Sequence, residues 1–251
     1  MIEAGRVQVG GAPAGSPSRQ VGPGESIVVA GPPRRFVSRG GDKLDAALDA
    51  FALDVAGRRC LDAGASTGGF TDCLLRRGAS SVVAVDVGRG QLAWGLRQDP
   101  RVTVLDRTNI RHVDTAAVGG PFDVVTADLA FISLRLVAPV LADLAVGSGS
   151  VVALVKPQFE AGRGRVGRGG VVRDPEVWRA AVSGVVDAFE ASDLAVVDGI
   201  VSPLRGADGN VEFLVHAVRG GRAVAGAAGR SRAGPLLDRL VPIPGPADPV
   251  P

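Results

Sequence analysis

Along residues 59–218, short apolar runs alternate with segments whose apolar residues recur at helical spacing. Such alternation is typical of an α/β fold in which helices cover both faces of a mostly parallel sheet. The connection before the seventh run is too short for a helix, so the last strand is predicted to run antiparallel to its neighbours. The predicted strands are 60–61, 81–87, 102–105, 122–127, 150–155, 194–201 and 211–218, and the predicted helices are 69–77, 91–98, 134–144 and 175–189.

The two ends of the chain differ in composition from this central region. Residues 1–33 are rich in Gly, Pro and Ser, and two alternating pieces, 6–9 and 26–29, predict small strands without an independent core. Residues 40–53 have apolar side chains at helical spacing and predict one amphipathic helix before the first strand of the sheet. From about residue 219 the periodicity is lost, and residues 219–251 are predicted to be disordered.

Several classes of protein are excluded by what the sequence lacks. Two cysteines and two histidines are too few for a disulfide framework or a structural zinc site, so we expect no metal and a reducing compartment. No apolar run approaches the ~20 residues of a membrane span, and the N-terminus lacks the layout of a signal peptide. The sequence therefore predicts a cytoplasmic protein that does not act on membranes.

The first predicted strand leads into a glycine-rich turn at residues 61–70 that opens a helix. Glycine lets the backbone approach a ligand closely there. The second and third strands end in acidic residues, and a short polar cluster follows the third. Each of these alone is equally well explained as an exposed polar residue, but their shared carboxyl edge predicts an adenosine-type cofactor. The candidate cofactor-binding residues are Asp62, Gly64, Ser66, Gly68, Asp86, Asp106 and Asn109.

Only two of the 28 basic residues are lysines, Lys43 and Lys156. Arginine stays protonated at working pH, whereas a lysine ammonium releases its proton when it is desolvated or lies near another cation. Lys156 follows the fifth strand and Asp128 the fourth, while Glu212 begins the reversed last strand, so all three belong to one edge. With Lys43 reaching in from the preceding helix, they form either a metal-free general base for an alcohol or two ion pairs that join loops.

The glycine-rich turn also matches G-x-S-x-G, the nucleophile elbow of hydrolases. In that alternative Ser66 is the nucleophile, His216 is the base, and Asp198 or Asp208 is the acid. The elbow lies on the first strong strand, however, without upstream strand pairs or an oxyanion loop. A hydrolase would also leave the acids at the other strand ends without a role.

Seven segments within residues 34–218 resemble the TlyA (haemolysin A) family of ribosomal RNA 2′-O-methyltransferases, which are relatives of the FtsJ enzymes. The resemblance implies a class I methyltransferase fold, S-adenosylmethionine as cofactor and the ribose 2′-hydroxyl of cytidine in 16S or 23S ribosomal RNA as substrate. Carried over by motif, it implies a catalytic tetrad of Lys43, Asp128, Lys156 and Glu212. The matching segments are residues 37–44, 61–72, 86–92, 107–109, 128–134, 154–160 and 209–212.

The chain departs from the family pattern at three places. Ala130 replaces a usual serine, and Arg89 replaces a usual aromatic residue. The family also begins with a complete S4 RNA-binding domain, whereas residues 1–33 resemble only the end of one. We therefore expect either a start placed at an internal methionine or a truncated protein with a weaker hold on RNA, which in the extreme binds RNA without activity.

Contact with RNA would depend on arginine. Arg163, Arg165 and Arg168 lie in a glycine-rich loop after Lys156, which suits them to follow phosphates, although a solvated loop explains them almost as well. Because the net charge is only +2, the basic surface has to be local. The expected partners are ribosomal RNA or ribosomal subunits, and no basic amphipathic helix supports a pore.

Overall fold

The computed structural model describes residues 2, 5–31, 34–162, 164–220 and 233–241, and the chain divides into two compact units at residues 35 and 36. The first unit is a small antiparallel sheet in the order β2-β1-β3. Val9 and Ala14 are its buried apolar residues. The short strands expected near residues 6–9 and 26–29 are therefore present. Their bounds are β1 (Val7–Val9) and β3 (Ile27–Val29), with β2 (Ala12–Pro13) between them.

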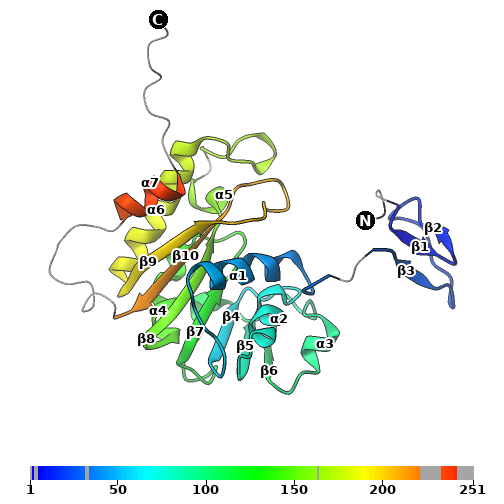
Figure 1. Ribbon diagram of the computed structural model, residues 1–251, viewed down its shortest axis with the longest axis horizontal. Helices are drawn as coiled ribbons and strands as arrows, with labels where there is room; N and C mark the ends of the chain where they lie inside the picture. The colour runs from blue at the N-terminus through cyan, green and yellow to red at the C-terminus, as the bar shows by residue number, and fades with distance from the viewer. Residues whose placement is uncertain (1, 3–4, 32–33, 163, 221–232, 242–251) are drawn as a thin grey trace, which may run out of the picture. The chain divides into compact units, whose positions relative to one another are not determined.

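The second unit contains a seven-stranded sheet in the order β6-β5-β4-β7-β8-β10-β9 (Figure 1). The first five strands of this order are parallel, and β10 runs antiparallel to both β8 and β9. The predicted mostly parallel sheet with a reversed last strand is thus confirmed. The strands are β4 (Arg59–Ala63), β5 (Ser81–Val85), β6 (Val102–Leu105), β7 (Phe122–Ala127), β8 (Ala145–Val155), β9 (Leu194–Val201) and β10 (Phe213–Arg219).

Helices follow the strands at nearly the predicted positions. Asp174 accepts a hydrogen bond from the Glu176 N–H and Pro175 occupies the first turn, so the long helix α6 begins where its sequence provides a cap. Ser133 caps α4 in the same way through the Arg135 N–H. The helices are α1 (Arg39–Ala50), α2 (Gly69–Arg76), α3 (Trp94–Arg97), α4 (Leu134–Leu144), α5 (Pro157–Glu160), α6 (Pro175–Ala191) and α7 (Ala233–Leu240), with short 3₁₀ turns at Ile110–His112 and Arg168–Gly170.

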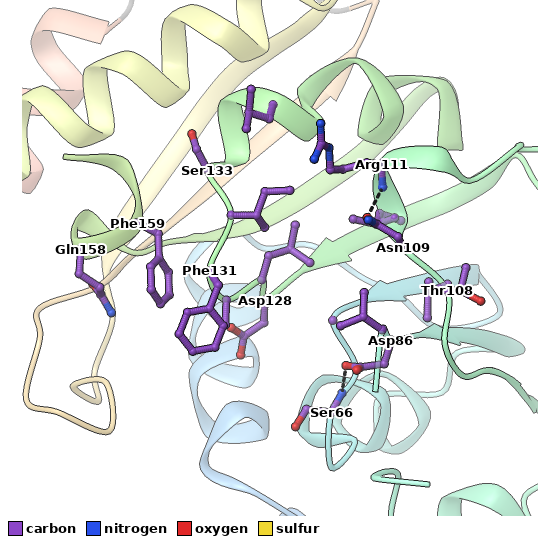
Figure 2. A pocket seen from close by; sticks show the side chains of 18 of the residues that line it. Ser66, Asp86, Thr108, Asn109, Arg111, Asp128, Phe131, Ser133, Gln158 and Phe159 are labelled. Atoms are coloured by element: carbon purple, nitrogen blue, oxygen red, sulfur yellow. Dashed lines mark hydrogen bonds between the residues drawn. The ribbon is translucent and has the colours of Figure 1, made fainter. Parts of the chain in front are cut away.

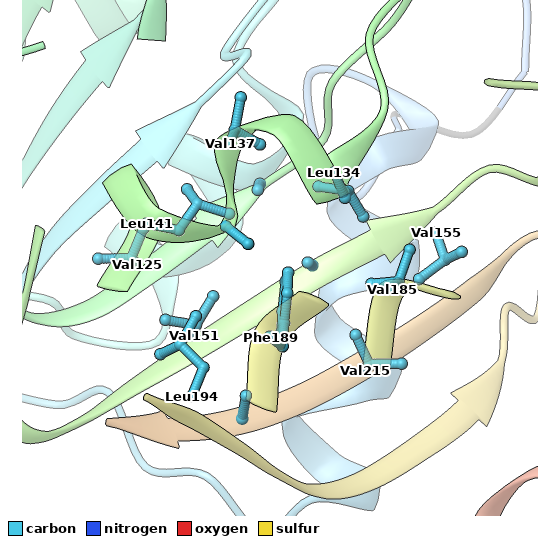
Figure 3. Packing of buried hydrophobic residues seen from close by; sticks show 14 of the residues in the cluster. Val125, Leu134, Val137, Leu141, Val151, Val155, Val185, Phe189, Leu194 and Val215 are labelled. Atoms are coloured by element: carbon cyan, nitrogen blue, oxygen red, sulfur yellow. The ribbon is translucent and has the colours of Figure 1, made fainter. Parts of the chain in front are cut away.

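Successive strand residues supply two different hydrophobic cores, because side chains alternate between the faces of a sheet. Val125, Val151 and Val215 pack with α4 and α6 on one face (Figure 3), and the leucines of α7 belong to the same cluster. The neighbouring strand residues Val124 and Val152 pack with α1, α2 and α3 on the other face. The sheet is buried on both sides, so its functional groups are confined to the strand ends and the loops that follow them.

Helix α7 corrects the prediction that residues 219–251 are disordered. Residues 233–240 form a helix that packs against α6 and β9, and it buries Leu236, Leu237 and Leu240. Arg239 pairs with Asp198 of β9. Three leucines in one short helix are too few to produce a periodic signal in the sequence. In the folded chain they are buried against α6 and β9. Residues 221–232 and 242–251 lie outside the described residues. In the part of the chain that is described, no helix is both long and apolar enough to cross a membrane.

Candidate active site

Loops at the carboxyl ends of the parallel strands enclose two adjoining cavities. The larger has a volume of about 1140 Å³ and extends from the glycine-rich turn past Asp86 to the loops after β6 and β7. The smaller, of about 480 Å³, lies between this turn, α1 and the segment before β10. Gly64, Ser66 and Asp128 line both cavities, so the loops after β4 and β7 form the boundary at which the two meet.

Gly64 is a residue of the turn at which any side chain would force the neighbouring backbone to move. Its φ is +85°, and a Cβ placed on it would lie 2.4 Å from the Asp128 carbonyl oxygen. The Asp128 N–H in turn donates to the Ala63 carbonyl at 3.0 Å. The loops after β4 and β7 therefore touch through their backbones, and this contact keeps the floor of both cavities open to a ligand.

Asp86, at the end of β5, fixes the turn from the opposite side (Figure 2). Its Oδ2 accepts from the Ser66 N–H at 2.8 Å and its Oδ1 from the Gly88 N–H at 2.6 Å. The Ser66 hydroxyl donates to Gln91 Oε1 at 3.2 Å. Asp86 thus presents an acceptor carboxylate to the larger cavity in a fixed orientation. Asn109 lines the far end of this cavity, and its side chain accepts from the Arg111 N–H at 3.1 Å.

Asp62 is one of three candidate cofactor residues that line neither cavity. Its side chain is fully buried below the turn, where it accepts hydrogen bonds from Thr71 at 2.7 Å and Thr126 at 3.3 Å. Burial raises the pKa of this carboxyl to about 7. Asp62 therefore supports the turn from beneath, which corrects the expectation that it contacts the cofactor.

Gly68 and Asp106 are the other two candidates that line neither cavity. A Cβ on Gly68 would collide with Leu92 and Leu96, so apolar side chains cover this glycine. Asp106 pairs with Arg97 and accepts from the Gly90 N–H at 3.1 Å. The hydrogen bond from Arg97 lowers the pKa of the Asp106 carboxyl. Asp106 is thus used to hold the loop after β5 and does not line the larger cavity.

The four residues expected to form a catalytic group all line the smaller cavity. They form two ion pairs: Lys43 Nζ lies 2.5 Å from Glu212 Oε2, and Lys156 Nζ lies 2.5 Å from Asp128 Oδ1. The first pair is sealed, with side-chain exposures of 8% and 3%, whereas the second has 14% and 24%. The Lys156–Asp128 contact lacks the alignment of a hydrogen bond. The more open pair is therefore the one that can exchange its partner for a substrate.

The hydrolase alternative is wrong because its three residues do not meet. Ser66 bonds to Gln91, as described above. His216 lies within β10, where its Nε2 contacts the Ser150 hydroxyl at 3.0 Å and its ring stacks on Phe51. Burial lowers the pKa of this imidazole. His216 is an interior residue of the sheet and has no access to the turn.

The arginine-rich loop belongs only in part to the described residues. Arg163 and the side chain of Arg168 lie outside the described residues, and Arg165 is exposed. Gly162, at the start of this loop, lines the larger cavity together with Val166. The loop thus begins at the site, and its role in contacting RNA stays a prediction.

Two phenylalanines of the site are not predicted from the sequence. Phe131, in the loop after β7, is 92% exposed and adopts a φ of +63°. Its ring lies 5.3 Å from that of Phe159 in α5, and both line the larger cavity (Figure 2). The sequence does contain one signal for this site: Phe131 is an aromatic residue just after the predicted strand 122–127, at a position where no core residue is expected.

The sequence of residues 36–219 matches the model of the FtsJ-like methyltransferases. The chain belongs to this family. A relative within it is the 16S/23S rRNA (cytidine-2′-O)-methyltransferase TlyA of Mycobacterium tuberculosis, which is 52% identical over 216 residues that cover 86% of this chain and 81% of that protein. The FtsJ-like assignment is consistent with the two cavities, because methyl transfer needs a cofactor site and a substrate site that meet.

Solved structures agree with the assignment to the FtsJ-like family. A Streptococcus thermophilus protein described as a hemolysin is 41% identical, with a TM-score of 0.76 over 87% of this chain and 80% of that one. An S-adenosylmethionine-dependent methyltransferase from Mesorhizobium loti is 17% identical, with a TM-score of 0.51 over 69% of this chain and 96% of that one. At that identity the likeness concerns the fold alone, and it confirms the predicted class I methyltransferase architecture.

Proposed function

We propose that this protein transfers a methyl group from S-adenosylmethionine to the ribose 2′-hydroxyl of a cytidine in 16S or 23S ribosomal RNA. One observation carries the proposal: Asp128, which pairs with Lys156, lies where the larger and the smaller cavity meet. An amine and a carboxylate at that boundary are placed to act on an alcohol beside a bound methyl donor. The named activity of the TlyA relative supports the nature of the alcohol.

The larger cavity fits the cofactor by its chemistry. The Asp86 carboxylate, held by two backbone N–H groups, suits the two hydroxyls of a ribose. Asn109 and the apolar Ile110 suit the adenine, and Gly64 with Ser66 leaves room for the amino-acid end. When bound there, the cofactor supplies an electrophilic methyl group on a sulfonium.

Lys156 acts as the general base in this proposal. Its amine would accept the proton of the 2′-hydroxyl, the group to which the bound cofactor would supply its methyl group. Asp128 orients the amine by the 2.5 Å contact. Lys43, fixed by Glu212, lines the same cavity and adds a second ammonium group to it.

The test is transfer of labelled methyl groups to ribosomal subunits from a strain that lacks the modification. We expect label in a ribosomal RNA cytidine with the native protein, and none with Lys156→Arg, because a guanidinium keeps the charge but does not accept a proton. Cofactor binding to the Lys156→Arg protein is the control for folding. A fully active Lys156→Arg protein would refute the base assignment.

A protein that binds RNA without activity is the alternative that this assay separates. It predicts that the native chain binds ribosomal RNA and transfers no label. Adding an upstream S4 domain to a second version of the chain then shows whether RNA affinity or chemistry limits transfer. Label that appears only with the added domain identifies affinity as the limit.

A further inference from the structure

Glu160 is a buried acid for which the proposed reaction has no use. It ends α5, four residues after Lys156, and is 6% exposed. It lines neither of the two cavities, so it contacts neither cofactor nor substrate in the proposed arrangement. Burial raises the pKa of this carboxyl. A buried carboxyl is costly unless its oxygens are bonded, and its partners indicate what it does.

All of the partners of Glu160 lie at the start of α4. Its Oε1 accepts from the Leu134 N–H at 2.7 Å and its Oε2 from the Ser133 hydroxyl at 2.5 Å. Arg135 closes the arrangement, because its Nη2 donates to the Glu160 carbonyl at 3.2 Å and its Nε lies 3.4 Å from Oε2. Glu160 therefore joins α5 to the end of the loop that begins at Asp128.

The two segments that Glu160 joins are those that carry the reactive pair. Asp128 starts the loop after β7, and its N–H is held by the Ala63 carbonyl. Lys156 starts the turn into α5, and its carbonyl accepts from the Phe159 N–H at 2.9 Å. The segments thus touch at the Lys156–Asp128 pair and again at Glu160, and the Phe131–Phe159 contact lies along the same pair of segments.

Two contacts between these segments fix the distance between Lys156 and Asp128, which a single contact would leave free. The Lys156–Asp128 pair is partly exposed and lacks hydrogen-bond alignment, so it does not hold the loops by itself. At the start of α4 the Ser133 hydroxyl accepts from the Arg135 N–H at 3.2 Å, and Glu160 satisfies the neighbouring Leu134 N–H from a different element. The carboxylate therefore completes the cap of α4 and at the same time ties this helix to α5.

We infer that Glu160 is a positioning residue for methyl transfer: by clamping the start of α4 to the end of α5, it holds Lys156 and Asp128 at the separation that the reaction requires. This inference rests on the proposed function. It predicts a loss in turnover and not in cofactor binding, because Glu160 lies away from the residues assigned to the cofactor.

Steady-state methylation of ribosomal subunits by Glu160→Ala tests the inference. We expect kcat to fall by about tenfold to a hundredfold, because a displacement on the order of 1 Å at reacting groups has effects of this size. The Kd for S-adenosylmethionine should stay within about threefold, a loss worth under ~1 kcal/mol. Glu160→Gln should recover most of the rate, since an amide can still accept from the Leu134 N–H and donate to Ser133.

The pH profile separates positioning from loss of stability. Because the proposed reaction includes a proton transfer at the Lys156–Asp128 pair, a change in the geometry of this pair should change the pH profile of the rate in Glu160→Ala. Asp45→Ala is the matched control, because Asp45 is equally buried and bonds Arg77 at 2.7 Å on the far side of α1. It should lower stability without moving the profile. If Glu160→Ala folds poorly, Arg135→Ala removes the exposed half of the clamp and should lower kcat in the same direction.

Each result decides the inference. Turnover in Glu160→Ala equal to that of the native protein, or a loss that Asp45→Ala reproduces with an unchanged pH profile, would overturn it. If the native protein methylates no ribosomal RNA, the proposed function fails first, and the inference fails with it. If the native protein is active and both Glu160→Ala and Arg135→Ala are fully active, the proposed function stands. Only the positioning role of Glu160 is then refuted.

Discussion

Asp62 provides a test of how the cofactor turn is supported, through the substitution Asp62→Asn. Its Oδ2 accepts from Thr71 and its Oδ1 from Thr126, whose hydroxyl also lies 3.3 Å from the Leu61 carbonyl. One Thr126 proton cannot serve both acceptors. A neutral amide resolves this conflict, because its NH₂ donates to Thr126 Oγ1 and frees that hydroxyl to donate to Leu61.

The magnitude follows from the pKa of Asp62. Burial raises it from 3.8 to about 7. Between these values the unfolded chain has lost the proton while the folded protein keeps it, so the free energy of unfolding falls as the pH rises. Each pH unit corresponds to about 1.4 kcal/mol, so the total loss is about 4 kcal/mol by pH 7. The substituted protein lacks this pH-dependent loss, so its free energy of unfolding relative to the native protein should grow by about 2 kcal/mol between pH 5 and pH 7.

Urea unfolding at pH 5, 6, 7 and 8, followed by the fluorescence of Trp94 and Trp178, measures this difference. Comparison with the native protein cancels the other titrating groups, including His216. Asp54→Asn, at an exposed carboxylate that accepts from the Ala56 N–H of its own turn, is the control for replacing a carboxylate by an amide at the surface. A constant difference for Asp62→Asn across this range would refute the reasoning, because the native carboxyl would then be charged throughout.

Three further substitutions test separate parts of the structure. Gly64→Ala should lower S-adenosylmethionine affinity by at least about tenfold, measured by calorimetry, because strain at a positive φ and the collision with the Asp128 carbonyl cost about 1–3 kcal/mol. Ser66→Ala should retain methyl transfer and lose only about 0.5–1.5 kcal/mol of binding, the value of one hydrogen bond; complete inactivity would contradict the cofactor role. Leu237→Ala should destabilise the protein by about 2–5 kcal/mol, whereas Leu136→Ala, at a side chain 62% exposed, should change its stability by about 0.5 kcal/mol or less in thermal unfolding.

The sheet could be predicted from the sequence because burial on both faces leaves continuous apolar runs, which differ sharply from the helices between them. The sequence also predicts that Asp128, Lys156 and Glu212 lie close together. The reason is that parallel strands end at one edge of the sheet, and an antiparallel strand begins at the same edge. What the sequence does not encode locally is the direction of a side chain at a strand end. Asp62 and Asp86 both end a strand with a carboxylate, yet one points below the turn and the other into the cavity.

Partners that come from distant loops were equally hidden. Asp106 follows its strand at the position expected of a cofactor-binding residue, but its carboxylate forms an ion pair with Arg97 from the preceding helix. Phe131 owes its exposure to a left-handed backbone conformation that its sequence gives no reason to expect. Such choices depend on packing between loops, and only the folded chain decides them.

The reversed direction of β10 has a consequence for how the protein matures. Glu212 immediately precedes this strand, and its partner Lys43 lies 169 residues earlier in the chain. Because β10 inserts between β8 and β9, the sealed ion pair forms only after nearly the whole domain has been synthesised and its last strand has entered the sheet. A chain still growing on a ribosome therefore contains Lys156 and Asp128 but lacks the Lys43–Glu212 pair. All four residues come together only when β10 enters the sheet.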